Sequence, residues 1–272
     1  MTNTSSPQPE PKPSHWADGA AYERYVGRWS RVVARQFLAW LSAAPDGRWL
    51  DVGCGTGALS QTILQQAAPR TVHGVDRSEA FVALAKQQVA DARARFESGD
   101  AQALPAETAA YDAVVSGLML TFVPQPERAA AEMARAARPG AVVAVYVWDY
   151  SEMMQMLRHF WDAASALDPA AAALDEGRRI SVCQPEPLAA IWRGAGLQAV
   201  EVTALDIDTH FTDFEDYWAP FLGGQGPAPA YAMGLNEERR AALRERLRAA
   251  LPFAADGSVP LVARAWAVRG VR

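Results

Sequence analysis

A glycine-rich segment is the part of this sequence best suited to holding a ligand. Residues 51–57 read Asp-Val-Gly-Cys-Gly-Thr-Gly and follow a short apolar run, a pattern typical of a buried strand that turns into a helix. Glycine lets the backbone adopt positive φ and approach a ligand that a Cβ atom would exclude. Asp76 lies about 20 residues further on, where a carboxylate can accept hydrogen bonds from both hydroxyls of a ribose. The spacing therefore predicts a site for a cofactor that contains a nucleoside.

Two classes of nucleoside cofactor fit this pattern. Gly53, Gly55 and Ala58 satisfy the dinucleotide fingerprint G-x-G-x-x-A, which leaves a nicotinamide or flavin enzyme open. Three features favour S-adenosylmethionine. The acid Asp51 precedes the first glycine by two residues, the glycines repeat as GxGxG, and residues 98–101 read Ser-Gly-Asp-Ala at the end of the predicted third strand. There an acid can accept a hydrogen bond from an adenine amino group, while the next amide reaches a ring nitrogen.

Short apolar runs alternate with amphipathic segments around these residues. The alternation predicts strands over residues 48–52, 71–75, 95–98, 111–116 and 141–148, and helices over 22–41, over 57–66, from Ser78 onward and over 125–137. Parallel neighbouring strands require a crossover, and helices of this length supply it. We therefore expect an α/β fold whose first five strands form a doubly wound sheet.

The second half of the chain is richer in helical and aromatic segments. It predicts a helix near residues 186–193, strands over 198–205 and 259–268, a capping box of Thr212 with Glu215, and a helix that Asn236 caps. We expect residues 1–18 to be a disordered arm and residues 19–272 to be one domain, because no flexible linker divides it. Helical cap segments over about 150–195 and 207–257 would form a lid insertion.

In its first half the chain resembles the class I S-adenosylmethionine-dependent methyltransferases, in particular the bacterial group that acts on small molecules. The resemblance rests on residues 49–57, 72–78, 99–101, 111–116 and 138–140, which follow the family's order within residues 20–150. It implies a Rossmann-like, mostly parallel sheet of seven strands in the order 3-2-1-4-5-7-6, with the last strand antiparallel. It also implies S-adenosyl-L-methionine as the cofactor.

The resemblance gives each motif residue a role toward that cofactor. By the family pattern, the backbone of Gly53 and Gly55 meets the methionine end, Asp76 meets the ribose, and Asp100 with Ala101 meets the adenine. The remaining cofactor residues are Asp51 of the glycine motif, Arg77 over the adenine, and Ser116 at the end of the fourth strand, beside the site of methyl transfer.

Aromatic residues dominate the parts of the chain expected to meet the methyl acceptor. Ligands of open α/β sheets bind at the carboxyl ends of the strands, and pockets lined with aromatic rings favour apolar or aromatic molecules. The predicted acceptor contacts are Tyr22, Trp29, Trp148, Trp161 and Trp218. Methyl transfer by in-line displacement needs a base only if the acceptor atom carries a proton, and the candidate bases are Asp149, Glu152, His159 and His210.

Composition argues against several other functions. The 272 residues carry a net charge of -5, whereas proteins that bind nucleic acid usually show a surplus of Lys and Arg. The Asn/Asp-Pro-Pro-aromatic loop used on base amino groups is missing after the fourth strand. Two cysteines are too few for a structural zinc site, so we expect no metal. No apolar run approaches the roughly 20 residues that span a membrane and no secretory signal is visible, so we expect a cytoplasmic protein with a small-molecule substrate.

Two further functions remain open on the residues alone. An NAD-type Rossmann oxidoreductase would bind a dinucleotide with the same glycine segment. A non-catalytic protein would bind the cofactor with the same fold and transfer nothing. Neither the oligomeric state nor the acceptor atom follows from the sequence.

Overall fold

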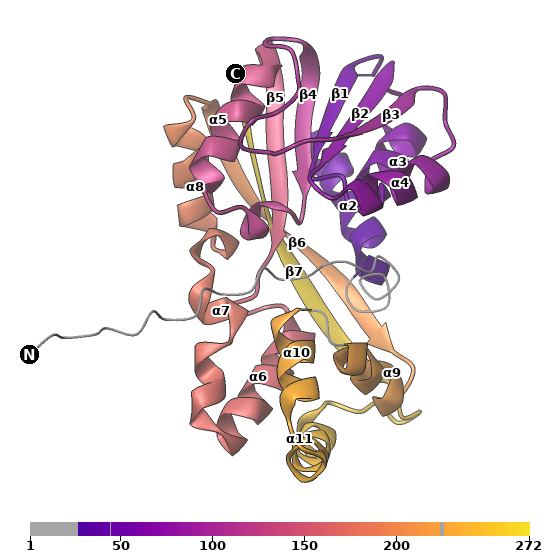
Figure 1. The fold of residues 1–272 in the computed structure, drawn as a ribbon, viewed down its shortest axis with the longest axis vertical. Helices are drawn as coiled ribbons and strands as arrows, with labels where there is room; N and C mark the ends of the chain where they lie inside the picture. Colours follow the sequence, from indigo (N-terminus) through magenta and orange to yellow (C-terminus); the bar gives the residue numbers. More distant parts are fainter. Residues whose placement is uncertain (1–26, 44, 224–225) are drawn as a thin grey trace, which may run out of the picture.

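A seven-stranded sheet forms the centre of the protein (Figure 1). The computed structural model describes residues 27–43, 45–223 and 226–272. The strands are β1 (Arg48–Val52), β2 (Thr71–Asp76), β3 (Ala94–Ser98), β4 (Tyr111–Gly117), β5 (Ala137–Trp148), β6 (Gln198–Phe211) and β7 (Val259–Val271). Their order is β3-β2-β1-β4-β5-β7-β6, and β7 runs antiparallel to both β5 and β6, whereas β1 to β5 pair in parallel. The predicted α/β fold and strand order are confirmed.

Helices cover both faces of the sheet because both faces are apolar. Side chains alternate along β1, so Trp49 and Leu50 join two different core clusters on opposite faces. One cluster lies under α2 (Arg28–Leu41), α3 (Ala58–Gln66) and α4 (Glu79–Gln88), the other under α5 (Pro126–Ala136) and α8 (Pro185–Gly194). All these helices coincide with predicted ones to within a few residues in the described part of the chain.

Two predicted helix starts are confirmed. Ser78 Oγ accepts a hydrogen bond from Phe81 N at 3.3 Å at the start of α4. Asn236 Oδ1 accepts one from Arg239 N at 2.9 Å at the start of α11 (Glu237–Ala250). Each cap satisfies a backbone donor that the first helical turn leaves unpaired.

The third predicted cap is wrong by one residue. Asp213, not Thr212, caps α9 (Phe214–Trp218): its Oδ1 accepts a hydrogen bond from Asp216 N at 2.9 Å, and Asp216 Oδ2 accepts one from Thr212 N at 3.0 Å. The sequence offers two overlapping capping boxes, and the box built from two acids also places negative charge at the positive end of the helix.

The sixth strand extends beyond its predicted end at residue 205. Leu205, Ile207, Thr209 and Phe211 are buried, while the residues between them are exposed, as in a strand with one covered face. β6 and β7 together form a long antiparallel ribbon that continues past the other strands (Figure 1).

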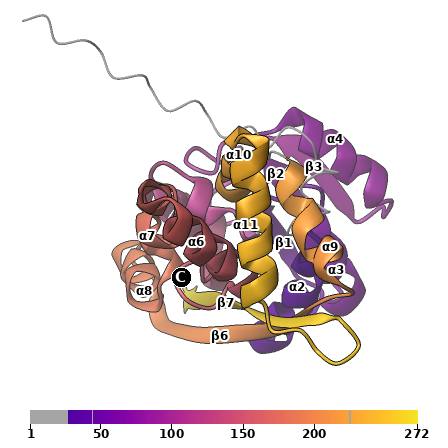
Figure 2. The same cartoon turned by 90° about the horizontal axis from the view of Figure 1, so that it is seen from below.

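Five short helices form a helical cap, which we define as residues 150–183 and the described part of 212–258 (Figures 1 and 2). Its elements are α6 (Gln155–Leu167), α7 (Glu176–Arg179), α9, α10 (Pro227–Gly234) and α11, with the 3-10 turns η3 (Pro169–Ala173), η4 (Ser181–Cys183) and η5 (Ala219–Gly223). In contrast, α8 packs on β6, β7 and α5. The first cap segment therefore ends before α8, earlier than the predicted residue 195, and the second begins after β6.

Part of the sequence lies outside the described residues, including the predicted arm 1–18 and the predicted acceptor contact Tyr22. Cys54 and Cys183 are buried free thiols. Among the helices of the described ranges, none combines the length and apolarity needed to cross a bilayer.

The position of the α9 cap can be tested by replacing each candidate. We expect Asp213→Ala to lower the free energy of unfolding by about 1 kcal/mol, because the helix loses its side-chain cap. Thr212→Ala is the matched control and should leave stability nearly unchanged, since its hydroxyl caps nothing. Urea unfolding followed by circular dichroism measures both. A larger loss for Thr212→Ala would contradict the assignment.

Candidate active site

The glycine segment forms a tight turn between β1 and α3. Gly53, Gly55 and Gly57 have φ of 71°, 54° and 92°, a region that glycine enters without strain. Gly53 N and Cys54 N both donate to Val75 O, at 2.7 and 3.1 Å, which ties the turn to the end of β2.

Each glycine of this turn has a different neighbourhood. A Cβ on Gly53 would overlap Met119 Cγ, and a Cβ on Gly57 would lie 2.7 Å from Val89 Cγ2. A Cβ on Gly55 would have no neighbour within 4 Å. Gly53 and Gly57 are therefore required by close packing, whereas Gly55 leaves its side of the loop open to a ligand.

Asp76 holds the glycine turn and the next helix together. Its Oδ2 accepts a hydrogen bond from Gly55 N at 3.0 Å, and its Oδ1 accepts one from Ser78 N at 2.9 Å. Burial raises the pKa of Asp76, and the two backbone donors act in the opposite direction. Each carboxylate oxygen keeps a second lone pair, so the same side chain can still accept from two ligand hydroxyls.

A cavity of about 60 Å³ lies between the ends of β1, β2, β3 and β4. Its wall includes five predicted cofactor residues, Gly53, Asp76, Arg77, Asp100 and Ala101, together with Met119, Phe122 and their neighbours. The structure thus brings together residues that are far apart in the sequence. Met119 and Phe122 are not among the predicted site residues, although their place directly after β4 points to this end of the sheet.

The cavity residues fit an adenosine in their chemistry, because the glycine turn contributes Gly53 to a wall that also carries two acids, Asp76 and Asp100. Asp100 is exposed and forms a local turn in which its Oδ1 accepts from Gln102 N at 2.8 Å. The volume is smaller than an adenosine, so binding requires side chains on the wall to move. Met119 is suited to this because its unbranched side chain has three rotatable bonds.

Asp51 lies beneath the turn rather than on the cavity wall. It is 0% exposed, its Oδ2 accepts a hydrogen bond from Ser60 Oγ at 2.6 Å, and its Oδ1 has no partner among the described residues. Burial raises the pKa of Asp51 to about 7. Its visible role is to join β1 to α3, which positions the turn.

The end of β4 is strained and tightly packed. Ser116 is 0% exposed, and its hydroxyl has no partner among the described residues. A Cβ on Gly117 would lie 2.5 Å from Tyr146 Oη, and Leu118 has φ of 62°, which is unusual for leucine. Leu118 N donates to Tyr146 O at 2.8 Å and holds this turn, which directs Met119 toward Gly53.

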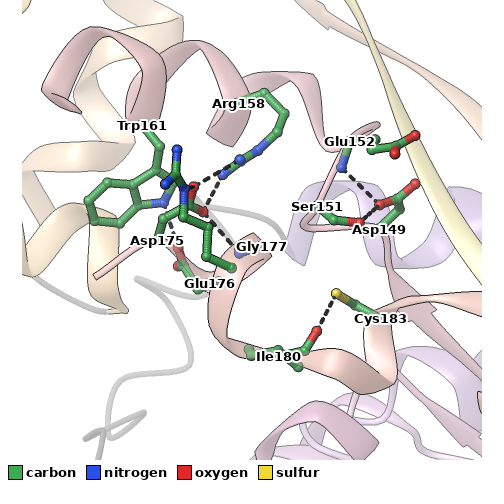
Figure 3. A network of polar contacts seen from close by, with 11 residues as sticks. Asp149, Ser151, Glu152, Arg158, Trp161, Asp175, Glu176, Gly177, Ile180 and Cys183 are labelled. Carbon is green, nitrogen blue, oxygen red and sulfur yellow. Dashed lines mark hydrogen bonds and ion pairs between the residues drawn. The ribbon is translucent and has the colours of Figure 1, made fainter. Parts of the chain in front are cut away.

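The four candidate bases do not form one cluster. Asp149 is buried directly after β5, and its Oδ1 accepts from Ser151 Oγ at 2.8 Å and from Glu152 N at 3.0 Å (Figure 3). His159 lies half-buried on α6, where burial lowers its pKa, and His210 lies on the exposed face of β6. No hydrogen bond joins either histidine to these acids within the described residues.

Two of the predicted acceptor contacts have unsatisfied polar atoms. Trp148 is 1% exposed at the end of β5, and Trp29 packs edge-on against Phe211 with the ring centroids 5.9 Å apart. Neither indole N–H has a hydrogen-bond partner in the described part of the chain. Arg28 lies over the same Phe211 ring at 4.5 Å and pairs with Asp216 at 2.8 Å.

The other two described tryptophans belong to the core of the helical cap. Trp161 is 1% exposed, and its indole N–H donates to Glu176 Oε2 at 2.5 Å (Figure 3). Trp218 is 4% exposed and packs against Phe221 at 6.0 Å. Both rings pack within the cap, and contact of Trp161 and Trp218 with the acceptor stays a prediction.

The turn after β5 lies against α7, and a polar network joins α7 to α6 (Figure 3). Arg158 pairs with Asp175, whose Oδ1 also accepts from Gly177 N at 2.9 Å. A Cβ on Gly177 would overlap Tyr150 O, so α7 lies directly against this turn. Burial raises the pKa of the neighbouring Glu176 to about 7.

Comparison with known proteins decides the family. A model described as a methyltransferase domain matches residues 50–145. A trans-aconitate 2-methyltransferase from Deinococcus radiodurans is 35% identical over 114 residues, 42% of this chain and 43% of that protein. A ubiquinone biosynthesis O-methyltransferase from Burkholderia pseudomallei is 30% identical over 176 residues, 62% of this chain and 73% of that protein. The chain belongs to the class I S-adenosylmethionine-dependent methyltransferases.

Solved structures show the same fold for this methyltransferase. The YcgJ protein from Bacillus subtilis has a TM-score of 0.59 at 14% identity, covering 89% of this chain and 98% of that one. Phosphoethanolamine N-methyltransferase 2 from Haemonchus contortus, in complex with S-adenosylhomocysteine, has a TM-score of 0.57 at 17% identity, covering 93% of this chain and 56% of that one.

Family membership also decides between the cofactor classes that the glycine pattern left open, in favour of S-adenosylmethionine. The extent of the sequence matches is limited. In the first curated relatives, the alignment covers 43%, 50% and 44% of their length.

The buried carboxyl of Asp51 predicts a pH dependence of stability. The folded protein holds its proton up to about pH 7, whereas an unfolded chain releases it near pH 4. The stability that this proton provides is fully present below about pH 4 and is lost as the pH rises to 7. By linkage, the free energy of unfolding falls by about 4 kcal/mol over this pH range. Asp51→Asn should abolish this pH dependence, because its amide oxygen still accepts from Ser60 Oγ but the side chain does not titrate. Unfolding free energies of both proteins between pH 4 and 8 measure the difference, and parallel curves would contradict the raised pKa.

Proposed function

We propose that this protein transfers a methyl group from S-adenosylmethionine to a small, largely apolar or aromatic acceptor by in-line displacement. The observation that carries the acceptor assignment is that the buried indole N–H groups of Trp29, which packs against Phe211, and of Trp148 have no hydrogen-bond partner among the described residues. Buried donors in native proteins nearly always have a partner. An apolar molecule with one or two acceptor oxygens would supply it.

Positioning supplies most of the catalysis in this proposal. When bound, S-adenosylmethionine provides an electrophilic methyl group on a sulfonium. The protein's task is to hold the acceptor atom about 3 Å from that carbon and to exclude water, which the buried aromatic residues do. If the acceptor atom carries a proton, Asp149 is the best supported base. It follows Trp148 directly, is 2% exposed, and uses only Oδ1 in its bonds to the turn.

Charge and relatives support a small-molecule acceptor. The net charge of -5 disfavours phosphate-rich substrates. The matched relatives are named for trans-aconitate, ubiquinone biosynthesis and demethylmenaquinone, which are small molecules. A non-catalytic role would require the cofactor to bind without any transfer, and the experiments below separate the two.

Calorimetric titration tests the cofactor half of the proposal. We expect S-adenosylhomocysteine to bind and NAD not to bind. Asp76→Ala should weaken binding by about 10- to 100-fold, the range for hydrogen bonds to a charged group. Leu167→Ala, an exposed residue at the end of α6, serves as the matched control and should leave affinity unchanged. Unchanged affinity in a folded Asp76→Ala protein would contradict the ribose assignment.

Transfer of labelled methyl groups to a panel of small aromatic and apolar acceptors tests the other half. With any accepted compound, Trp148→Phe should raise KM about tenfold and leave the affinity for S-adenosylhomocysteine unchanged, because an aromatic ring stays while the N–H and the volume of the second indole ring are lost. Trp192→Phe is the control, since its N–H donates to Val143 O at 3.0 Å within the core. Failure of every acceptor in the panel would remove the support for this acceptor class.

A further inference from the structure

A second, larger cleft lies away from the cofactor cavity. Its volume is about 590 Å³, within the range of small-molecule sites. It is lined by Arg48, Thr71, His73, Ala92, Arg93, Ala94, Arg95, Glu97, Pro105, Glu107 and Tyr111. These residues come from β1, β2, β3 and the start of β4, toward the amino ends of the strands, whereas the cofactor cavity lies at the carboxyl ends.

The connection between β3 and β4 explains why this cleft exists. Residues 99–110 join the two strands without a helix, so no helix of this crossover covers the adjacent face of the sheet. The side chain of Leu104 fills part of that face near the carboxyl ends. Toward the amino ends of the strands, polar side chains line this face. His73 lies at the bottom of the cleft and is 2% exposed.

The polar residues of the cleft are organised around Tyr111. Its hydroxyl lies 2.7 Å from His73 Nδ1 and 3.5 Å from Arg95, which also donates to His73 Nδ1 at 3.1 Å. Arg48 lies over the ring of Tyr111 at 5.4 Å. On the other side of the imidazole, His73 Nε2 lies 2.7 Å from Glu97 Oε1. Two guanidinium groups thus meet at one tyrosine.

These two arginines have no ion-pair partner among the described residues. Neither Arg48 nor Arg95 forms an ion pair with any described residue, whereas Arg93 is held by Asp91 at 2.7 Å. Two carboxylates, Glu97 and Glu107, also lie on the wall, and neither forms an ion pair with Arg48 or Arg95. Like charges that converge on one side chain repel each other, and an anion between them removes that repulsion.

We propose that this cleft binds a small oxyanion, a phosphate ester or a carboxylate, through the guanidinium groups of Arg48 and Arg95. The planar guanidinium presents paired N–H donors that match the oxygens of both groups. The Tyr111 ring and Pro105 offer an apolar wall for the rest of the molecule. The site is separate from methyl transfer, although residues 99–110 contribute to the walls of both cavities.

Calorimetry on the full chain, saturated with S-adenosylhomocysteine so that the cofactor cavity is filled, tests the proposal. Inorganic phosphate and citrate are titrated separately, and the tighter of the two identifies the oxyanion class. We expect one saturable site, weakened about tenfold or more in Arg95→Gln and in Arg48→Gln. Arg95→Lys keeps the charge but lacks the paired donors. Its affinity for the anion should lie between those of the unsubstituted protein and of Arg95→Gln.

A matched control removes the same charge elsewhere. Arg193 lies on α8, outside the cleft, where it pairs with Glu186. Arg193→Gln should change the affinity less than about twofold. Absence of saturable binding for both anions would overturn the proposal, as would an equal loss in the control, which would indicate attraction to overall charge. Thermal unfolding of each variant confirms that it is folded.

Discussion

The cofactor end of this protein depends on one carboxylate, that of Asp76. A glycine turn with three residues at positive φ has few bonds of its own, and its conformational freedom is a cost that the folded state must offset. Asp76 supplies two bonds at once, to Gly55 N and to Ser78 N. Because Ser78 caps α4, the same side chain fixes the turn, the end of β2 and the start of the next helix. The rest of the cavity wall is placed relative to this point.

Two buried acids near the turn serve different purposes. Asp76 has backbone donors for both oxygens, so its charge is compensated. Asp51 has one donor, from Ser60, and an oxygen without a partner among the described residues, so burial favours its neutral form. The two carboxyls differ because Asp76, the last residue of β2, lies at the edge of the sheet, whereas Asp51 lies within β1. A protonated acid can hold α3 against the sheet without bringing a charge into the core.

Local sequence signals predicted the sheet half of the molecule well and the helical cap less well. Strand β1 ends at its glycines, and Ser78 begins α4, because each depends on a few adjacent residues. The predicted N-cap of α9 was wrong by one residue because Thr212 and Asp213 both fit a capping box. The aromatic residues could not be assigned from sequence, because a tryptophan in a cap core and one beside a ligand share the same pattern. Met119 reaches the cavity only through the strained turn at Leu118.

The tryptophans differ in the partner of the indole N–H, and the N–H of Trp49 in the core is also unpaired among the described residues. Trp192 donates to Val143 O and Trp161 to Glu176, and both rings are thereby explained by the fold itself. Trp148 is just as buried but has no acceptor in the described chain, and leaving such a donor unpaired costs about 1 to 3 kcal/mol. A fold that tolerates this cost next to the end of β5 is more stable with a ligand oxygen there. The matched family model ends at residue 145, so the sequence that the family shares does not specify what the Trp148 N–H faces.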